Sequence, residues 1–225
     1  LFTYRNLARQ DVDEAQAGDI VAFGGLDEIG ISDTIAHPSV ERPLPAISIE
    51  EPTVRMTFGV NTSPFAGREG KWSTSRKLRE RLFNELRNNV ALRVSETESA
   101  DTFVVAGRGE LHLAILIENM RREGYEIAVS RPRVVTKEID GKLCEPYEIL
   151  AVDIEDSSQG AVMMALGSRG GQLQAMHPDG KGRVRLDYVI PARGLIGFQT
   201  EFRTTTSGMG LLFHVFDHYA PVLDK

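Results

Sequence analysis

The feature that most constrains the fold is an internal repeat in the order of the predicted elements. From residue 47 onward the hydrophobic pattern predicts strand, helix, strand, strand, helix and strand, and the same order returns from residue 144. A Glu-Pro pair opens each copy, as Glu51-Pro52 and as Glu145-Pro146. This order is the ferredoxin-like, or split β-α-β, motif. The sequence therefore predicts two ferredoxin-like domains in tandem.

An Arg-Gly pair precedes the second long helix of each copy, as Arg108-Gly109 and as Arg193-Gly194. Because glycine tolerates a positive φ and a close backbone approach, we expect Gly109 and Gly194 to form tight structural turns. The first pair is part of a Gly-x-Gly that enters a helix, which is also compatible with a phosphate site. A dinucleotide fingerprint would need a third glycine at position 112, where the chain has His112. The structural turn is therefore the preferred interpretation.

Apolar residues at strand and helix spacing predict the core of the first copy. The inward strand positions are Ile49, Val54, Met56 and Phe58, and Ser73 or Thr74 is the expected N-cap of the first helix. The core-facing helix positions are Leu78, Leu82, Phe83 and Leu86, followed by Leu113, Leu116, Ile117 and Met120. In the second copy we expect one helix over residues 193–208.

The first 45 residues have a different pattern. A short apolar strand, Ile20 to Phe23, is bounded by glycines, and a proline-rich linker follows over residues 37–45. Short strands between glycines suggest the end of a β-barrel, and we expect the chain to be a fragment. The predicted α+β organisation is a barrel tail (1–45), a ferredoxin-like domain (46–134) and a second one (135–225).

Composition limits the class of protein. The chain is 41% hydrophobic, no apolar run approaches the roughly 18 residues of a membrane span, and no secretory leader pattern is visible. The single cysteine, Cys144, excludes an internal disulfide and suits a reducing compartment. We expect a cytoplasmic monomer without a membrane partner.

No pattern in the chain predicts catalysis, a metal site or a cofactor. A P-loop, Gly-x-x-x-x-Gly-Lys-Ser/Thr, is absent from the sequence. The five histidines do not form a metal-ligand pattern with carboxylates or with Cys144. We therefore expect no catalytic residue, no nucleotide-binding residue, no metal ligand and no cofactor in these 225 residues.

Charge is unevenly distributed along the chain, whose net charge is −6. Residues 1–51 have three basic and ten acidic residues, whereas residues 68–93 have eight basic and three acidic ones. Basic side chains in this arrangement suit phosphate contacts on RNA. The candidates are Arg68, Lys71, Arg76, Lys77, Arg79, Arg81 and Arg87, with Arg169, Lys181 and Arg183 in the second copy. A salt-bridged surface helix that uses Glu80 and Glu85 explains the first group equally well.

Several long motifs resemble translational GTPases of the elongation factor G class. "AGRGELHLAILIENMRREGYEIAVSRPRV" resembles their third domain, and "AGDIVAFGGL…ISDTI" resembles the end of their second, β-barrel domain. Within the class, "NTSPFAGREGK", "DGKGRVRLDYVIPARGLIGF" and "TEFRTTTSGMGLL" resemble the BipA (TypA) family. The resemblance covers essentially the whole chain.

The resemblance implies a ribosome-dependent GTPase that acts in stress response and ribosome assembly. It implies that the domain that binds GTP and Mg²⁺ is missing here, so this chain should not hydrolyse GTP. The implied partners are ribosomal RNA and ribosomal proteins, with transfer RNA contacted through a missing C-terminal domain. The alternative is a metabolite-sensing pair of ferredoxin-like domains, which would bind a ligand at the interface of the two domains.

Overall fold

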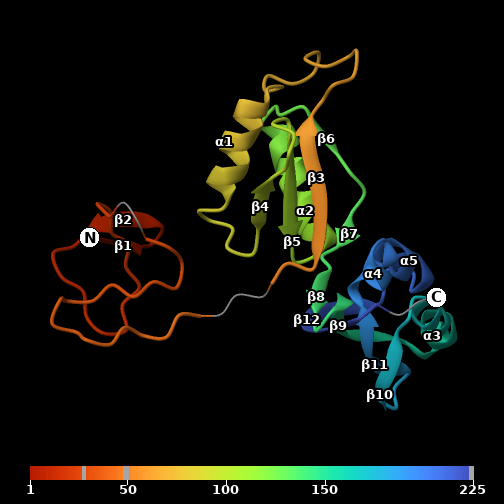
Figure 1. The fold of residues 1–225 in the computed structure, drawn as a ribbon. Coiled ribbons are helices and arrows are strands. Elements are labelled where there is room, and N and C mark those ends of the chain that lie inside the picture. Colours follow the sequence, from red (N-terminus) through yellow and green to blue (C-terminus); the bar gives the residue numbers. More distant parts are fainter. Residues whose placement is uncertain (27–28, 48–50, 223–225) are drawn as a thin grey trace. The chain divides into compact units, whose positions relative to one another are not determined.

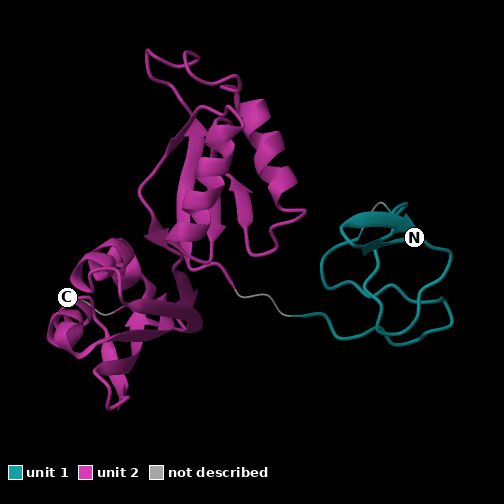
Figure 2. Cartoon of the chain, turned by 180° about the vertical axis from the view of Figure 1, so that it is seen from behind, with its two compact units in different colours: residues 1–47 teal, residues 48–225 magenta. Residues whose placement is uncertain are grey.

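The computed structural model describes residues 1–26, 29–47 and 51–222. Its two compact units are residues 1–47 and residues 48–225, coloured separately in Figure 2. The architecture is mixed α+β, and its sheets are built from antiparallel strands. None of the helices among the described residues is long and apolar enough to cross a membrane.

Unit 1, residues 1–47, contains one two-stranded sheet, β1 (Phe2–Arg5) paired with β2 (Ala8–Asp11). This hairpin was not predicted, because neither of its turn residues, Asn6 and Leu7, is a glycine. Both nevertheless have a positive φ. The predicted strand Ile20 to Phe23 is reduced to a single bridge between Ala22 and Phe2, and Ile20 is 93% exposed. No described residue of unit 1 is buried, so the barrel origin stays a prediction.

The first half of unit 2, called module A, runs through β3 (Val54–Val60), α1 (Ser75–Glu85), β4 (Arg93–Glu96), β5 (Thr102–Gly107), α2 (Glu110–Arg122) and β6 (Ile127–Val129). The strand order in its sheet is β4-β5-β3-β6, with β7 (Arg133–Val134) also paired to β3. Both the element order and this strand order agree with a ferredoxin-like fold. The two helices cover one face of the sheet (Figure 1).

The core of module A follows the predicted hydrophobic positions. The buried strand residues include Val54, Met56 and Phe58, and the predicted helix positions Leu78, Leu82, Leu113, Leu116 and Met120 are also buried. Phe83, Leu86 and Ile117 pack partly buried against this core. Thr74 is the N-cap residue of α1, although its side chain makes no capping hydrogen bond. Ile49 lies outside the described residues.

The second half of unit 2, called module B, runs through β9 (Lys142–Glu155), a 3₁₀ turn (Asp156–Ser158), α3 (Gln159–Ser168), β10 (Gln172–Pro178), β11 (Arg183–Pro191), α4 (Ala192–Leu195), α5 (Phe198–Thr205) and β12 (Leu211–Pro221). Its strand order, β10-β11-β9-β12, repeats that of module A, and β8 (Lys137–Ile139) pairs with β9. A separate core is formed where strand residues such as Leu150, Val152 and Ile154 pack against α3 and α5.

One prediction for the second copy is wrong in detail, and two short strands were missed. The single helix expected over residues 193–208 is two helices, α4 and α5, because Gly197 between them has a left-handed φ of 73°. The stretch between the two modules, for which no strand was predicted, contributes β7 and β8 to the two sheets. Strands of two or three residues leave little periodicity in the sequence, which explains why they were missed.

The two Arg-Gly turns differ in their need for glycine. The backbone of Gly109 is extended, with φ 178°, and a Cβ added there would come no closer than 3.7 Å, to His214 Cε1. The expectation of a positive φ or a close approach at Gly109 is therefore wrong. A Cβ at Gly194 would lie 2.5 Å from the carbonyl oxygen of Arg169, so the close approach expected there is present.

Candidate nucleic-acid interface

Three of the basic residues proposed on α1 are in ion pairs. Lys77 Nζ lies 3.1 Å from Glu80 Oε2, and Arg79 Nε lies 2.6 Å from Glu96 Oε1 on β4. The guanidinium of Arg79 also stacks over the ring of Phe83, which lies 4.7 Å away. The salt-bridged helix that the sequence left open as an alternative thus describes this part of α1.

Arg81 is the most strongly held of the candidates. Its guanidinium contacts Glu123, after the end of α2, at 2.6 Å, and Glu85 on its own helix at 2.7 Å. The hydrogen bond with Glu123 is the largest of the effects that raise the pKa of Arg81, against the opposing effect of burial. Only 18% of this side chain is exposed. Arg81 therefore connects α1 to the end of α2, and its predicted RNA contact stays a prediction.

Four other candidates of module A are exposed and make no ion pair with any described residue. Lys71 and Arg68 lie in the loop before α1, and Arg76 and Arg87 lie at the beginning of α1 and just after its end. The only described partner of the Arg68 guanidinium is the ring of Phe65, at 4.9 Å. These four cations are available to phosphate groups in a way that Arg81 is not.

In module B, Arg169 has a structural role. Its guanidinium donates to the carbonyl oxygens of Gly194 and Ile196, at 2.9 and 3.3 Å, and to Glu201 at 2.6 Å. These bonds hold the break between α4 and α5 in place, because the carbonyls that end a short helix need donors. The RNA contact predicted at Arg169 stays a prediction beside this structural role.

The other two candidates of module B flank the hairpin between β10 and β11. Arg183 donates to the carboxylate of Asp153 at 2.7 Å and to its carbonyl oxygen at 3.2 Å, so its charge is engaged on the neighbouring strand. Lys181 stands at the tip of the hairpin and is exposed, with no described partner for its ammonium group. Of the three candidates of module B, Arg169 and Arg183 are thus in ion pairs, whereas Lys181 has no described partner.

Sequence reasoning overlooked the aromatic residues beside the exposed cations. Phe65 is 63% exposed and Trp72 is 40% exposed, and both lie in the loop that leads into α1. Glu126, after α2, accepts hydrogen bonds from this loop. The signal was present in the sequence as two aromatic residues interleaved with Arg68 and Lys71.

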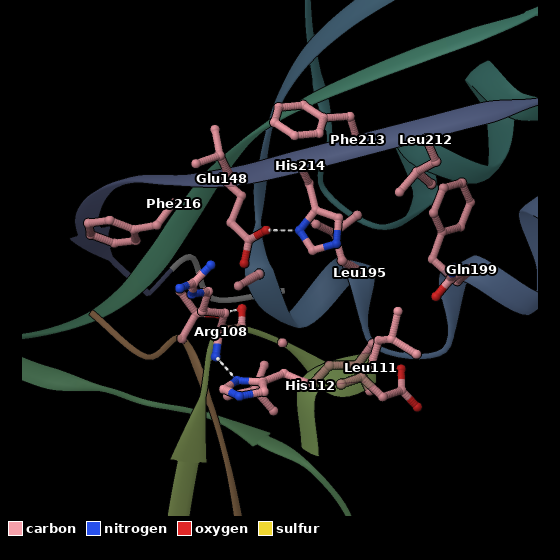
Figure 3. Close-up of a pocket in the computed structure, with 18 of the residues that line it drawn as sticks. Arg108, Leu111, His112, Glu148, Leu195, Gln199, Leu212, Phe213, His214 and Phe216 are labelled. Carbon is pink, nitrogen blue, oxygen red and sulfur yellow. Dashed lines mark hydrogen bonds and ion pairs between the residues drawn. The ribbon is translucent and has the colours of Figure 1, made fainter. Parts of the chain in front are cut away.

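A cavity of about 440 Å³ in unit 2 is lined by residues of both modules (Figure 3). Glu148, 2% exposed on β9, accepts a hydrogen bond from His214 Nδ1 on β12. On the other side, His112 Nδ1 accepts the backbone N–H of Arg108 at 3.3 Å, and the Arg108 side chain is exposed. Apolar side chains such as Leu111 and Leu195 also line the cavity.

The polar groups of the cavity do not assemble a recognisable catalytic arrangement. Thr53, the only hydroxyl among its lining residues, donates to the carbonyl oxygen of Arg108 at 2.7 Å. Burial is the main cause of the lowered pKa of His112, so this imidazole is neutral near pH 7. Within the described part of the chain, no group of three His, Cys, Asp or Glu residues is placed to hold a metal ion.

The comparison with known sequence families finds a match over module B. Residues 142–225 match the sequence family described as "Elongation factor G C-terminus". This range begins with β9 and includes the strand order described above.

Individual proteins that match nearly the whole chain give a more specific comparison. The chain is 62% identical over 219 residues to "Large ribosomal subunit assembly factor BipA" of Salmonella typhimurium, which covers 97% of this chain and 36% of the relative. It is 61% identical to the protein of the same name from Haemophilus influenzae and 54% identical to that from Buchnera aphidicola, over 95% and 97% of this chain and 35% and 36% of the relatives.

The resemblance to the BipA family is therefore confirmed: over nearly all of its residues the chain is homologous to one part of these proteins. It spans about a third of the length of the curated relatives that it matches.

Proposed function

We propose that this chain is a ribosome-binding part of a BipA-like translational GTPase that acts in assembly of the large ribosomal subunit and in stress response. The relatives are named as large ribosomal subunit assembly factors, which supports the ribosomal part of this proposal. The cytoplasm is the proposed compartment, and the monomer is the proposed state. The 225 residues contain no P-loop, so GTP and Mg²⁺ would be bound by residues outside them.

The proposed domain identities follow the elongation factor G order. Residues 1–45 would be the end of the β-barrel domain, 46–134 the first ferredoxin-like domain and 135–225 the second. Exposed apolar side chains in unit 1, such as Ile20, Ile31 and Leu44, support the barrel assignment, because the remaining strands of a barrel would cover them. Transfer RNA would be contacted by parts of the protein that lie outside this chain.

The proposed contact with ribosomal RNA is made by the unpaired cations of module A, together with Lys181 in module B. The single observation that carries it is the contrast on and around α1. Arg79 and Arg81 are neutralised by carboxylates, whereas Arg76 and Arg87 are exposed without a described acidic partner. A cation that is already in an ion pair gains less free energy from binding a phosphate, because its contact with the carboxylate must first be broken. Ribosomal proteins are the second proposed partner.

Charge reversal at the two unpaired arginines tests this function. We expect Arg76→Glu with Arg87→Glu to weaken co-sedimentation of the chain with large ribosomal subunits. Each lost phosphate contact also makes the dependence of log affinity on log salt shallower by about one unit, so the double variant should lose about two units. The measurement is co-sedimentation over a series of salt concentrations.

The matched control is Lys142→Glu with Arg203→Glu. Both residues are exposed in module B and make no described ion pair, so this variant has the same change of net charge. We expect its ribosome affinity to fall much less. Equal loss in both double variants would show that only net charge matters, and unchanged affinity and salt slope in Arg76→Glu with Arg87→Glu would contradict the proposed surface.

The metabolite-sensing alternative has one observation in its favour, the cavity shared by the two modules. The relatives reported above are all named as ribosomal subunit assembly factors, which favours the ribosomal function. We therefore keep the ribosome as the proposed partner.

A further inference from the structure

The loop between β3 and α1 exposes two aromatic rings, each with a cation beside it. Arg68 Cζ lies 4.9 Å from the centroid of the Phe65 ring, and Lys77 Nζ lies 5.2 Å from that of Trp72. Phe65 is 63% exposed. Large exposed aromatic side chains lose the free energy that burial would provide, so two of them in one loop require an explanation beyond folding.

The loop is held in a defined conformation by one carboxylate. Glu126 accepts hydrogen bonds from Asn61 Nδ2 at 2.8 Å and from the backbone N–H groups of Gly67 and Gly70 at 2.8 and 3.3 Å. The bond from Asn61 is the largest of the effects that lower the pKa of Glu126, so the carboxylate is ionised at neutral pH. At Gly70 a Cβ would lie 2.8 Å from Glu126 Cβ, so glycine permits this close approach.

The position of Trp72 is fixed by the backbone as well. The backbone N–H of Trp72 donates to the carbonyl oxygen of Gly124 at 3.1 Å. The backbone carbonyl oxygen of Trp72 accepts the N–H of Glu126 at 3.0 Å. Its ring lies 6.4 Å from that of Tyr125, tilted by 39°. A ring held in this way loses little conformational entropy when a ligand stacks on it.

Charge around the two rings is positive. Residues 61–77 include four basic residues, Arg68, Lys71, Arg76 and Lys77, and one acidic residue, Glu69. Only Lys77 of these cations has a described carboxylate partner, Glu80. Exposed aromatic rings interleaved with unpaired cations are the chemistry of surfaces that bind single-stranded nucleic acid, where bases stack on the rings and phosphates meet the cations.

We propose that residues 61–77 bind unpaired nucleotides of an RNA, with Phe65 and Trp72 stacking on bases and Arg68, Lys71 and Arg76 contacting the flanking phosphates. The proposal rests on the proposed ribosomal function and deepens it, because phosphate contacts alone give the two rings no role. Stacking tolerates any base, so this surface reads the unpaired state of the RNA and not its sequence.

Trp72 provides a direct assay, because it is the only tryptophan of the chain. The probes are a short oligouridylate and an abasic ribose-phosphate chain of the same length, which has the phosphates without the bases. Tryptophan fluorescence of the 225-residue chain is followed as each is added. We expect oligouridylate to quench the fluorescence and to bind more tightly than the abasic chain. Equal quenching and equal affinity for the two probes would overturn the proposal.

Phe65→Leu removes the second ring and leaves Trp72 as the reporter. Stacking of one base contributes on the order of 1–3 kcal/mol, so we expect oligouridylate affinity to fall by about five- to a hundredfold, with little change for the abasic chain. The control is Phe213→Leu, which alters an exposed phenylalanine of β12 that has no described cation over its ring. We expect this control to bind both probes as the unaltered chain does.

Failure of the stacking proposal and failure of the proposed function give different results. If Phe65→Leu binds oligouridylate normally, the proposal that Phe65 stacks on a base is wrong. This holds whatever effect Arg76→Glu with Arg87→Glu has on ribosome binding. If Phe65→Leu binds RNA normally but sediments poorly with ribosomal subunits, the ring contacts a protein, which also overturns the proposal. If the stacking assay succeeds while charge reversal leaves ribosome binding unchanged, the proposed function fails and the single-stranded RNA site remains.

Discussion

Modules A and B have the same order of elements and the same order of strands, yet they use matching residues differently. When the two Arg-Gly pairs are aligned, Arg108 corresponds to Arg193. Arg193 Nε lies 2.8 Å from a carboxylate oxygen of Glu145, whose side chain is 1% exposed. Arg108 is exposed at the edge of the cavity. The same motif therefore stabilises a buried carboxylate in one module and leaves a surface cation in the other.

In the same alignment, His112 of module A corresponds to Gly197 of module B. His112 lies in a continuous α2, accepts the backbone N–H of Arg108 through Nδ1, and contacts Asn89 Oδ1 through Nε2 at 3.0 Å. Gly197 interrupts the corresponding helix, and its N–H donates to Glu110 of module A at 2.8 Å. A repeated motif thus predicts the element order, while the neighbours of each residue decide its role.

The largest expected difference between the modules is at the paired arginines. Removal of one partner from a buried ion pair leaves an uncompensated charge, which typically costs about 3–5 kcal/mol. We expect Arg193→Met to lower the free energy of unfolding by about that amount. Arg108→Met, at an exposed position, should change it by less than about 0.5 kcal/mol. Urea unfolding followed by circular dichroism measures both, and similar effects in the two variants would remove the contrast.

The two glycines of the motif provide a second test of the comparison. Gly194→Ala places a Cβ against the carbonyl oxygen of Arg169, and such overpacking costs about 1–3 kcal/mol. Gly109→Ala has room for the added atom and an extended backbone, so we expect a loss below about 1 kcal/mol, from the weaker N-cap preference of alanine. Urea midpoints measure the difference. A larger loss at Gly109 than at Gly194 would restore the original expectation that its turn requires glycine.

The sequence predicted the parts of the fold that depend on local periodicity. The buried positions of α1 and α2 follow the helical repeat, and those of β3 alternate, so both could be read directly. The break at Gly197 could not, because apolar residues continue on both sides of it at helical spacing. The predicted boundaries of the three domains stay predictions.

The candidate interface was only partly predictable, for a related reason. Partners one helical turn apart, such as Glu85 for Arg81, are visible in the sequence. Arg79 and Arg81 also pair with Glu96 and Glu123, which are distant in the sequence and are brought close by the fold. Such tertiary pairs decide which cations remain unpaired, so the sequence alone could not separate the paired candidates from the unpaired ones.

The smallest expected effect is the pH dependence that His112 gives to module A, since module B has Gly197 at the matching position. Burial, followed by the charge of Arg108, lowers the pKa of His112 below its ordinary value of 6.5. The folded state then binds this proton more weakly than the unfolded state does. The stabilising contribution is therefore fully present above about pH 6.5 and is lost as the pH falls below that value toward the folded-state pKa.

His112→Gln keeps a polar side chain but cannot be protonated, so its free energy of unfolding should vary less with pH between neutral and mildly acidic conditions than that of the unaltered chain. Urea unfolding over this pH range measures the difference in slope. His177→Gln, which removes a largely exposed histidine of β10, is the matched control with which the slope of His112→Gln is compared. If the slope of His112→Gln equalled that of the unaltered chain, His112 would not be the group that distinguishes module A. The acid sensitivity would then have to come from other groups, among them the carboxylates that both modules contain, whose loss of charge destabilises the fold at lower pH.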